Sequence, residues 1–280
     1  MSPVLQEPPR ESPLRIVSLV PSLTESLFSL GLGDRVVGVT DWCVHPAASV
    51  ASLPKVGGTK DADAEAIAAL APDLVLANHE ENTRRVVEEL DARGLAVWVT
   101  YPRTVREGAE LLAELARLGA SEVARREVVE PVLAAVRDAE ERCVGATSRA
   151  PRVFCPIWRD PWMAPAADTY IHDMIVLCGG TNVTAEPLPE TPRRTRRSGE
   201  RYPQLTLLEV EALAPDVVWL PDEPYAFGDK DRRELLGLAM PAARDGRVHL
   251  IDGTWVSWYG PRIRQAIAKL GDLLTPRTGS

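Results

Sequence analysis

Cysteine is scarce in this sequence, and its few cysteines are far apart. Four occur in 280 residues, namely Cys43, Cys143, Cys155 and Cys178. No two of them stand at a Cys-x-x-Cys spacing, which cysteine-ligated metal sites usually need. We therefore expect four free thiols and no metal bound through cysteine.

Long apolar runs and an excess of positive charge are missing as well. No segment approaches the roughly 18 apolar residues of a membrane span, and no apolar run precedes Ile16. From the chain as written we expect no secretory leader and a cytoplasmic protein, whereas a periplasmic or membrane-associated protein would imply a misassigned start site. The net charge of -8 argues against nucleic acid as a partner.

Motifs of catalysis are also absent. The chain has no Gly-rich phosphate loop, no nucleophile elbow and no His-x-x-x-His pair among its 4 histidines, which argues against a dedicated zinc or manganese site. The nearest cluster is Asn78-His79-Glu80-Glu81-Asn82, which follows a predicted strand. An enzyme would use His79 and Glu80 as acid-base groups or metal ligands. A helix cap with a charged first turn explains the acidic residues and Asn82 without any chemistry, so binding is the main interpretation and an enzyme is the alternative.

What the sequence does contain is an internal repeat. Residues 67–76 read IAALAPDLVL and residues 210–219 read VEALAPDVVW, with six of ten positions identical. Each copy is typical of a helix end, an Ala-Pro-Asp turn and a short buried strand. Residues 15–17 (RIV) and 152–154 (RVF) open the two halves in the same way. The repeat predicts an α/β protein of two similar lobes, each with a parallel central sheet.

A long helical segment separates the two copies of the repeat. Between Ala124 and Cys143 apolar residues recur every three or four positions, which keeps one stripe on one helix face. Pro131 interrupts the pattern because it lacks a backbone N–H and crowds the preceding turn, so we expect a kink there or a helix start near Arg126. The predicted division is a disordered tail at 1–14, an N-terminal lobe at 15–120, a connecting backbone helix at 121–148 and a C-terminal lobe at 149–280.

Tryptophan is concentrated in loops where parallel sheets bind ligands. Aromatic residues make up only 5% of the chain, yet five tryptophans follow predicted strands: Trp42, Trp158, Trp162, Trp255 and Trp258. Core packing would explain any one of them. Five together favour a large, flat or apolar ligand held between the lobes, because loops after the carboxyl ends of parallel strands line the binding crevice and aromatic faces bury a large area.

Two of the histidines share this placement. His45 lies in the long loop between residues 40 and 60, and His79 follows the predicted third strand, so both are candidates for ligand contact. We interpret His172 and His249 as structural.

Several segments together carry a resemblance to a known family. They are RIVSLVPSLTESLFSLGLGDRVVGVTDWCVHP, LAPDLVLANHEEN, DTYIHDMIVLCGGTNV, RYPQLTLLEVEALAPDVVWL and WYGPR. In this order they resemble the helical-backbone, class III substrate-binding proteins of ABC importers, over about Arg15 to Leu274, and most of all the cobalamin-binding members. The resemblance implies a monomer of two lobes joined by one long helix, with no intrinsic cofactor and a corrinoid or another metal chelate clasped between the lobes. A ferric siderophore or heme is the alternative ligand.

The resemblance also marks individual residues. The aromatic residue that faces the corrin in cobalamin binders corresponds to Tyr202. His45 stands where those proteins have a tyrosine, residues 78–79 (Asn-His) where they have a tryptophan, and residues 254–255 (Thr-Trp) where they have Asp-Trp. Together with the tryptophans above, the predicted ligand-binding residues are Trp42, His45, His79, Trp158, Trp162, Tyr202, Trp255 and Trp258.

The same resemblance points to a protein partner, the permease of an ABC importer. Family receptors present a surface glutamate on the helix before each Pro-Asp turn, and Glu65 occupies that place in the first lobe. In the second lobe the place belongs to Leu208, and Glu209 is turned away from it by about 100 degrees around an ideal helix. We therefore expect weak docking or none, with Glu65 and Glu209 as the residues concerned.

Overall fold

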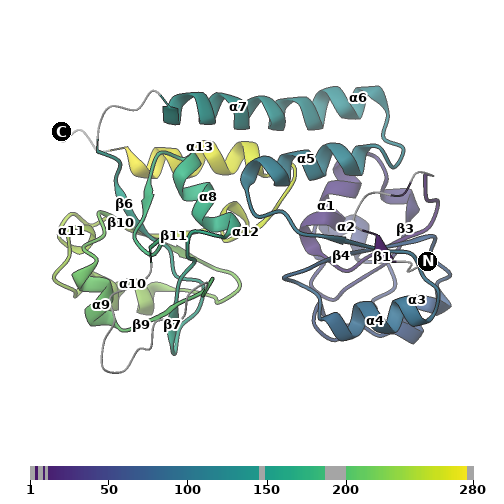
Figure 1. The fold of residues 1–280 in the computed structure, drawn as a ribbon, viewed down its shortest axis with the longest axis horizontal. Coiled ribbons are helices and arrows are strands. Elements are labelled where there is room, and N and C mark those ends of the chain that lie inside the picture. The colour runs from purple at the N-terminus through teal and green to yellow at the C-terminus, as the bar shows by residue number, and fades with distance from the viewer. Residues whose placement is uncertain (1–3, 6–8, 10–11, 145–148, 187–199, 276–280) are drawn as a thin grey trace. The chain divides into compact units, whose positions relative to one another are not determined.

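The computed structural model describes residues 4–5, 9, 12–144, 149–186 and 200–275. The chain forms two compact α/β units, whose elements are coloured in chain order in Figure 1. The first unit comprises Met1–Pro102, Arg106–Ala134 and Tyr259–Pro261, and the second comprises Arg103–Val105, Ala135–Trp258 and Arg262–Ser280. The predicted α/β class with a parallel sheet in each half is confirmed. The segment 121–148, predicted as a connecting helix of its own, is shared between the two units.

The first unit is built on a five-stranded parallel sheet in the order β1-β5-β4-β2-β3. Strands β2 to β5 are almost entirely buried, as expected for parallel strands covered on both faces. β1 differs from the disordered tail predicted at residues 1–14, because Val4 pairs with Val97 and Leu5 with Trp98. The strands are β1 (Val4–Leu5), β2 (Ile16–Ser18), β3 (Val36–Val39), β4 (Leu74–Asn78) and β5 (Val97–Thr100).

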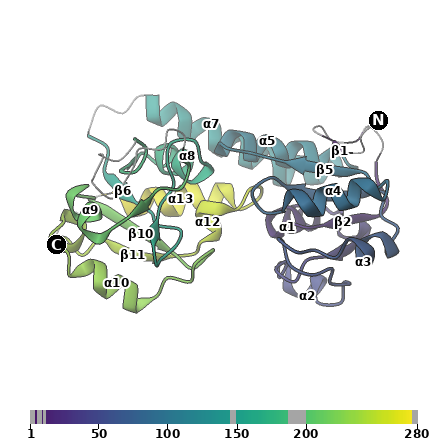
Figure 2. The ribbon, with the colours of Figure 1, turned by 60° about the horizontal axis from the view of Figure 1, so that its bottom comes forward.

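Helices connect the strands of the first unit and supply the rest of its core. Ile67 and Leu90, from two of these helices, share one apolar cluster with Val75 of the central strand β4. The two helices, α3 and α4, contact each other and can be followed in Figure 2. The helices of this unit are α1 (Pro21–Ser29), η1 (Gly33–Arg35), α2 (Ala47–Val50), α3 (Ala64–Ala69), α4 (Arg84–Ala92), α5 (Val105–Ala116) and α6 (Glu122–Ala124).

The second unit repeats this plan with a four-stranded parallel sheet in the order β11-β10-β6-β8. The sheet strands are β6 (Arg152–Phe154), β8 (Thr181–Asn182), β10 (Val217–Pro221) and β11 (Val248–Ile251), and a separate antiparallel pair joins β7 (Trp162–Met163) to β9 (Gln204–Leu205). The helices are α8 (Tyr170–Leu177), α9 (Leu207–Ala212), α10 (Asp229–Leu236), α11 (Pro241–Arg244), α12 (Thr254–Ser257) and α13 (Ile263–Leu274). The β7–β9 pair and α12 fall in stretches that the sequence indicates only as loops.

Both copies of the sequence repeat make the same pair of hydrogen bonds. In the first unit the Asp73 N–H donates to the Arg15 carbonyl oxygen at 2.8 Å, and Asp73 Oδ2 accepts from the Arg15 N–H at 2.9 Å. In the second unit Asp216 and Arg152 make the same two bonds at 2.8 and 2.9 Å. Each aspartate therefore ties the turn before one strand to the start of a neighbouring strand.

The arginines of these pairs complete the junction by capping a helix. Arg15 Nη2 donates to the Leu70 carbonyl oxygen at 2.7 Å, and Arg152 Nη2 donates to the Leu213 carbonyl oxygen at 2.8 Å. Leu70 and Leu213 are the C-cap residues of α3 and α9, whose last carbonyls have no partner inside the helix. A cation at a helix C-terminus is also favourable because the helix dipole is negative there.

The helix that follows α5 has an irregular turn at the predicted place. It begins at Glu122, capped by Ser121 Oγ, and passes through a π-helical turn, η2 (Arg125–Val129), into α7 (Glu130–Val144). The Glu130 N–H donates to the Arg125 carbonyl oxygen, five residues back. Pro131 has no N–H to donate, and a widened turn directly before it accommodates that loss. The alternative of a helix start near Arg126 is wrong.

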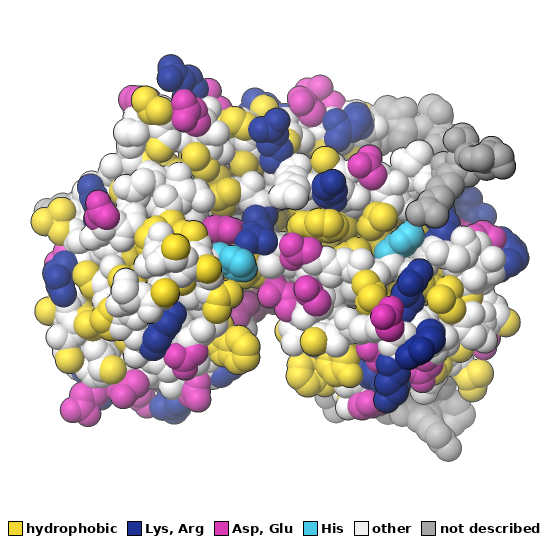
Figure 3. All heavy atoms as spheres, turned by 180° about the vertical axis from the view of Figure 1, so that it is seen from behind, with side chains coloured by type: hydrophobic (Ala, Val, Ile, Leu, Met, Phe, Trp, Pro, Cys, Tyr) yellow, Lys and Arg dark blue, Asp and Glu magenta, His cyan; other side chains and the backbone are white. Residues whose placement is uncertain are grey.

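The surface carries charges of both signs. On the face shown in Figure 3, Lys and Arg side chains are interspersed with Asp and Glu side chains. With a formal net charge of -8, this face offers no single-sign field that would attract a polyanion.

Candidate ligand-binding site

An imidazole and a phenol meet where two strands of the first sheet end. His79 directly follows β4 and is exposed, while Tyr101 directly follows β5 and is 38% exposed. Their ring centroids lie 4.4 Å apart with the planes inclined by 43°, and the His79 N–H donates to the Thr100 carbonyl oxygen at 2.9 Å. The sequence alone singled out His79 but not Tyr101, although Tyr101 also stands directly after a strand.

Trp42 is the most exposed aromatic residue of the first unit, with 66% of its surface accessible. The loop below it is firmly held, because the Asp41 N–H donates to the Gly57 carbonyl oxygen at 2.9 Å and the Cys43 N–H to that of Thr40 at 3.1 Å. The Cys43 side chain is buried beneath the loop, and burial raises the pKa of its thiol. Trp42 therefore presents a large apolar face on a rigid base, and His45 lies half-buried in the same loop.

The Asn78–Asn82 cluster is mainly a structural turn. Asn78 Oδ1 accepts from the Glu80 N–H at 2.8 Å, and Asn82 Oδ1 accepts from the Asn78 N–H at 2.8 Å. Asn82 Nδ2 donates to the Thr59 carbonyl oxygen at 2.8 Å, so the turn is also bound to the loop that carries Trp42. Side chains of Asx type commonly fix the backbone in this way. These hydrogen bonds are those expected if the polar residues form a turn and cap a helix.

In the second unit a row of aromatic rings leads from the surface into the core. Trp158 is 45% exposed and meets Tyr225 edge to face, with centroids 5.7 Å apart. Tyr225 lies 4.7 Å from Phe227, which stacks on Trp162 at 5.6 Å. Trp162 is only 6% exposed and belongs to the apolar core. Trp158 is thus the accessible end of this row, and Trp162 supports it from behind.

A buried ion pair fixes the loop between Trp158 and Trp162. Arg159 is 12% exposed, pairs with Asp231 and with Glu234 at 2.7 Å, and holds its guanidinium 5.3 Å from the Trp162 ring centroid. Burial alone would raise the pKa of Asp231, but the Gly228 N–H and the Arg159 guanidinium bind its carboxylate and lower that pKa overall. The loop that carries Trp158 is therefore anchored to α10.

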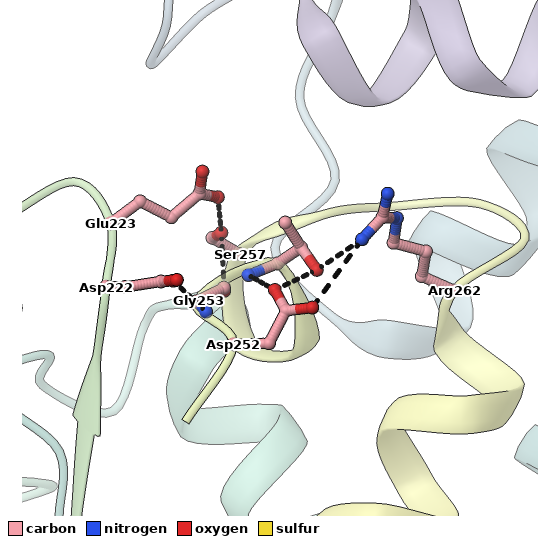
Figure 4. Close-up of polar contacts among 7 residues, drawn as sticks. Asp222, Glu223, Asp252, Gly253, Ser257 and Arg262 are labelled. Atoms are coloured by element: carbon pink, nitrogen blue, oxygen red, sulfur yellow. Dashed lines mark hydrogen bonds and ion pairs between the residues drawn. The ribbon is translucent and has the colours of Figure 1, made fainter. Parts of the chain in front are cut away.

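Carboxylates gather where β10 and β11 end, as Figure 4 shows. Asp222 Oδ1 accepts from the Gly253 N–H at 2.7 Å, and Glu223 Oε1 accepts from Ser257 Oγ at 2.8 Å. Glu223 is half-buried, and burial raises the pKa of its carboxyl group. The loop after β10 is therefore bound to the loop after β11 through two acidic side chains.

Arg262 binds the loop after β11 from its other side. It donates to Thr254 Oγ1 at 2.9 Å, lies 3.7 Å from the Asp252 carboxylate and holds its guanidinium 4.8 Å from the Trp258 ring centroid. Trp258 is 8% exposed, and its carbonyl oxygen accepts from Tyr170 Oη at 3.3 Å. Trp258 is thus a packed residue of this loop rather than an exposed face.

The two remaining predicted residues have different surroundings. Tyr202 is half-buried, with the Arg201 guanidinium 5.7 Å from its ring centroid. Trp255 lines a groove of about 460 Å³ along the outer side of β11, together with Arg232, Leu250 and Lys269. None of the other predicted ligand-binding residues lines that groove. Among the described residues, no group of three or more His, Cys, Asp or Glu side chains is placed to hold a metal ion.

Exposed aromatic rings thus stand on braced loops at the strand ends of an α/β protein. The chain belongs to the periplasmic binding protein family, whose sequence pattern it matches over residues 16–253. Proteins of this family and the neighbours named below are substrate-binding proteins, not enzymes. The chain is therefore a substrate-binding protein, as predicted, and the alternative of an enzyme using His79 and Glu80 is rejected.

Relatives named for their ligands are similar to this chain over most of its length. It is 29% identical over 219 residues, covering 76% of each chain, to the vitamin B12-binding proteins of Yersinia pseudotuberculosis serotype O:3 (strain YPIII) and Yersinia pestis (strain Pestoides F). The periplasmic vitamin B12 binding protein BtuF of Vibrio cholerae has the same fold, with a TM-score of 0.78 at 23% identity over 94% of this chain and 97% of that one. The periplasmic heme-binding protein RhuT from Roseiflexus sp. RS-1 gives 0.73 at 25% identity over 93% and 97%.

The comparisons also bear on location. The family is described as periplasmic, so the prediction of a cytoplasmic protein gains no support from it. Within the part of the chain that the structure describes, no helix combines the length and the apolar character needed to cross a bilayer.

Proposed function

We propose that this protein binds a corrinoid, or another flat metal chelate, through aromatic loops at the carboxyl ends of its strands. The observation that carries the proposal is the exposure of Trp42 and Trp158, at 66% and 45%, on loops that are otherwise tightly hydrogen-bonded. Exposed tryptophan faces on rigid supports suit a large planar ligand, because binding costs little side-chain entropy and removes much apolar area from water. The relatives named for vitamin B12 and heme support the same ligand class.

The proposed contact residues differ in their roles. In the first unit Trp42, His45 and His79 offer rings to the ligand, and Tyr101 joins them because its ring centroid lies 4.4 Å from that of His79. In the second unit the contacts come from Trp158 and Tyr202. The predicted residues Trp162 and Trp258 are packed behind the surface, and Trp255 lines the outer groove beside β11.

Fluorescence and visible spectroscopy test the proposal directly. Corrins and porphyrins absorb where tryptophan emits, so a bound ligand should quench the emission strongly. Cobalamin, cobinamide, heme and ferric siderophores are titrated separately into the purified protein. If none of them quenches the emission at tens of micromolar, the flat metal chelate is the wrong ligand class and a smaller solute is favoured.

Heme is the second candidate, and the pair of His79 and Tyr101 favours it. An imidazole and a phenol 4.4 Å apart on an exposed edge can supply a nitrogen or an oxygen ligand to an iron centre. If either group ligates iron, His79→Ala or Tyr101→Phe should shift the visible bands of the heme complex as well as weaken it. An unchanged spectrum with lower affinity would show that the rings only pack against the ligand.

We also propose that the protein works as a monomer and docks only weakly to an ABC permease. Glu65 is exposed on α3 and suits docking, but the Glu209 carboxylate accepts from the Thr206 N–H at 2.7 Å and from Thr206 Oγ1 at 2.9 Å. It closes the first turn of α9, while the neighbouring Leu208 is 76% exposed. A pull-down in which a cognate permease binds with micromolar or tighter affinity would contradict this proposal.

Cell fractionation decides between the cytoplasmic and the periplasmic location.

A further inference from the structure

Two of the four thiols line the same surface groove of the second unit. Cys143 lies in the last turn of α7, and Cys178 is the C-cap residue of α8. Both side chains, together with Ile267 and Gly271 of α13, line a groove of about 340 Å³. Both residues are half-buried and both are free thiols. Neither contributes to the ligand-binding loops described above, so they need a separate explanation.

The contacts of Cys143 place its sulfur beside the backbone of Cys178. Cys143 Sγ donates to the Val176 carbonyl oxygen at 3.3 Å and lies 3.5 Å from that of Leu177, the residue directly before Cys178. These carbonyls belong to the last turn of α8, where a helix leaves its acceptors without internal partners. The first thiol is therefore already held at the end of the helix that carries the second.

The two thiols differ in accessibility and in acidity. Cys178 Sγ faces Met174 Sδ at 3.9 Å and the Ile267 carbonyl oxygen at 3.8 Å, and burial together with the charge of Cys143 raises its pKa to about 12. Burial also raises the pKa of Cys143, but the neighbouring Arg142 partly offsets this effect. Cys143 is thus the thiol that ionises and reacts more readily, because the thiolate is the nucleophile.

We propose that Cys143 and Cys178 form a redox pair that closes to an intramolecular disulfide when the protein meets a small-molecule disulfide. The Cys143 thiolate attacks one sulfur of the oxidant, the oxidant's S–S bond breaks, and one equivalent of its thiol leaves after taking up a proton. Cys178 then loses its proton and attacks the sulfur of Cys143, and the second equivalent of thiol leaves. Two protein thiols and one small disulfide thus become one protein disulfide and two small thiols.

Burial of the two sulfurs favours this product. A disulfide is uncharged, so the burial that opposes ionisation of both thiols does not oppose the bond itself. The second step is intramolecular, and a high effective concentration compensates for the weak acidity of Cys178. Once formed, the bond joins α7 to α8 and removes conformational freedom from the unfolded chain, so it should raise the melting temperature.

Oxidation with glutathione disulfide tests the proposal on the full-length protein. The expected result is a loss of two hydrogen atoms in the intact mass, a peptide that links Cys143 to Cys178, and a melting temperature higher by several degrees, all reversed by dithiothreitol. Cys178→Ser should stop at a mixed disulfide with glutathione on Cys143. Cys143→Ser should not react at a comparable rate.

Matched controls separate this pair from the other cysteines. Cys43 and Cys155 are fully buried, so Cys43→Ser and Cys155→Ser should oxidise as the unchanged protein does. A stable mixed disulfide on Cys143 in the unchanged protein, a disulfide-linked dimer, or a link to Cys43 or Cys155 would each overturn the proposal. An unchanged mass after full exposure to the oxidant would overturn it as well.

Discussion

Asp216 and Arg152 are joined by two hydrogen bonds, one between their backbones, from the Asp216 N–H to the Arg152 carbonyl oxygen at 2.8 Å, and one from the Arg152 backbone N–H to Asp216 Oδ2 at 2.9 Å. Asp73 and Arg15 repeat this arrangement in the first unit. The turn before each aspartate also repeats, since Ala71 and Ala214 both have a φ of 45°. The sequence repeat thus preserves a strand-locking contact in both units.

Removing either aspartate should destabilise the protein. Asp216→Ala leaves the Arg152 N–H without its acceptor, and an unsatisfied, partly buried donor costs about 1 to 3 kcal/mol. Asp73→Ala should act in the same direction through Arg15. Denaturant unfolding followed by circular dichroism measures both effects. Asp245→Ala is the control, because the Asp245 side chain pairs with Arg244 on the exposed surface and its loss should leave the unfolding midpoint unchanged.

Gly253→Ala should distort the loop after β11. A Cβ atom there would come within 2.8 Å of the Glu223 backbone nitrogen and 2.9 Å of its carbonyl oxygen, so the two loops must move apart. Overpacking of this kind typically costs about 1 to 3 kcal/mol. Gly271→Ala is the matched control, since its Cβ would meet only the Cys178 carbonyl oxygen at 3.9 Å and alanine favours the helix α13. The melting temperature should therefore fall for Gly253→Ala and rise for Gly271→Ala. A higher melting temperature for Gly253→Ala would refute the argument.

Glu223 should make stability depend on pH in a definite direction. Burial raises its folded-state pKa above the ordinary value of 4.5. The folded protein therefore holds this proton more tightly than the unfolded chain, and the resulting stability is complete below pH 4.5 and is lost as pH rises through the raised pKa. Glu223→Gln keeps an acceptor for Ser257 without the charge, so its stability relative to the unchanged protein should increase between pH 4 and pH 7.

Unfolding midpoints at several pH values measure this difference. Asp231 provides the opposite case, because its pKa is lowered in the folded state and its contribution is lost as pH falls through that pKa. Asp231→Asn should therefore destabilise the folded protein most at neutral pH and least in acid. A constant difference in unfolding midpoint between Glu223→Gln and the unchanged protein from pH 4 to pH 7 would contradict a raised pKa of Glu223.

Trp42→Ala and Trp158→Ala should weaken ligand binding with little effect on folding. Trp42 is 66% exposed and Trp158 is 45% exposed in the free protein, so the loss of either ring removes apolar contact area chiefly from the complex. We expect a loss of about 1 to 3 kcal/mol, roughly ten- to hundredfold in the dissociation constant. Fluorescence titration measures the affinity, and thermal melts measure the folding.

Trp162→Ala gives the contrasting control. Trp162 is 6% exposed and stacked on Phe227, so truncation should cost about 3 to 5 kcal/mol of stability.

Equal affinity losses for Trp42→Ala and a conservative surface change such as Arg84→Lys would argue against a ligand contact at Trp42.

Local patterns in the sequence were enough to predict the parallel sheets, the two-fold repeat and the irregular turn before Pro131. They did not predict β1 or the β7–β9 pair, because a two-residue strand has no period of its own and forms only where a distant partner offers a free edge. The helix α12 was missed for a similar reason, since a single turn is defined by its contacts and not by its propensity.

The proposed ligand-binding residues show the same limit of local sequence patterns. Position after a strand indicates which loops carry rings, and it would also have marked Tyr101 if tyrosine had been counted with tryptophan. It does not tell which ring faces water. Trp158 is 45% exposed and Trp162 is 6% exposed, four residues later in the same loop, because burial depends on the partners Tyr225 and Phe227 from another part of the chain.

The widened turn at Arg125–Val129 can absorb a change in chain length that a regular helix cannot. It holds one residue more than an α-helical turn, so deleting one residue from it would leave an ordinary α-helical turn and keep the segments on either side in phase. A deletion within α7 itself would instead rotate the preceding part of the helix by about 100 degrees and turn apolar positions away from the core. We therefore expect related chains to differ in length at this turn more readily than elsewhere in the helix.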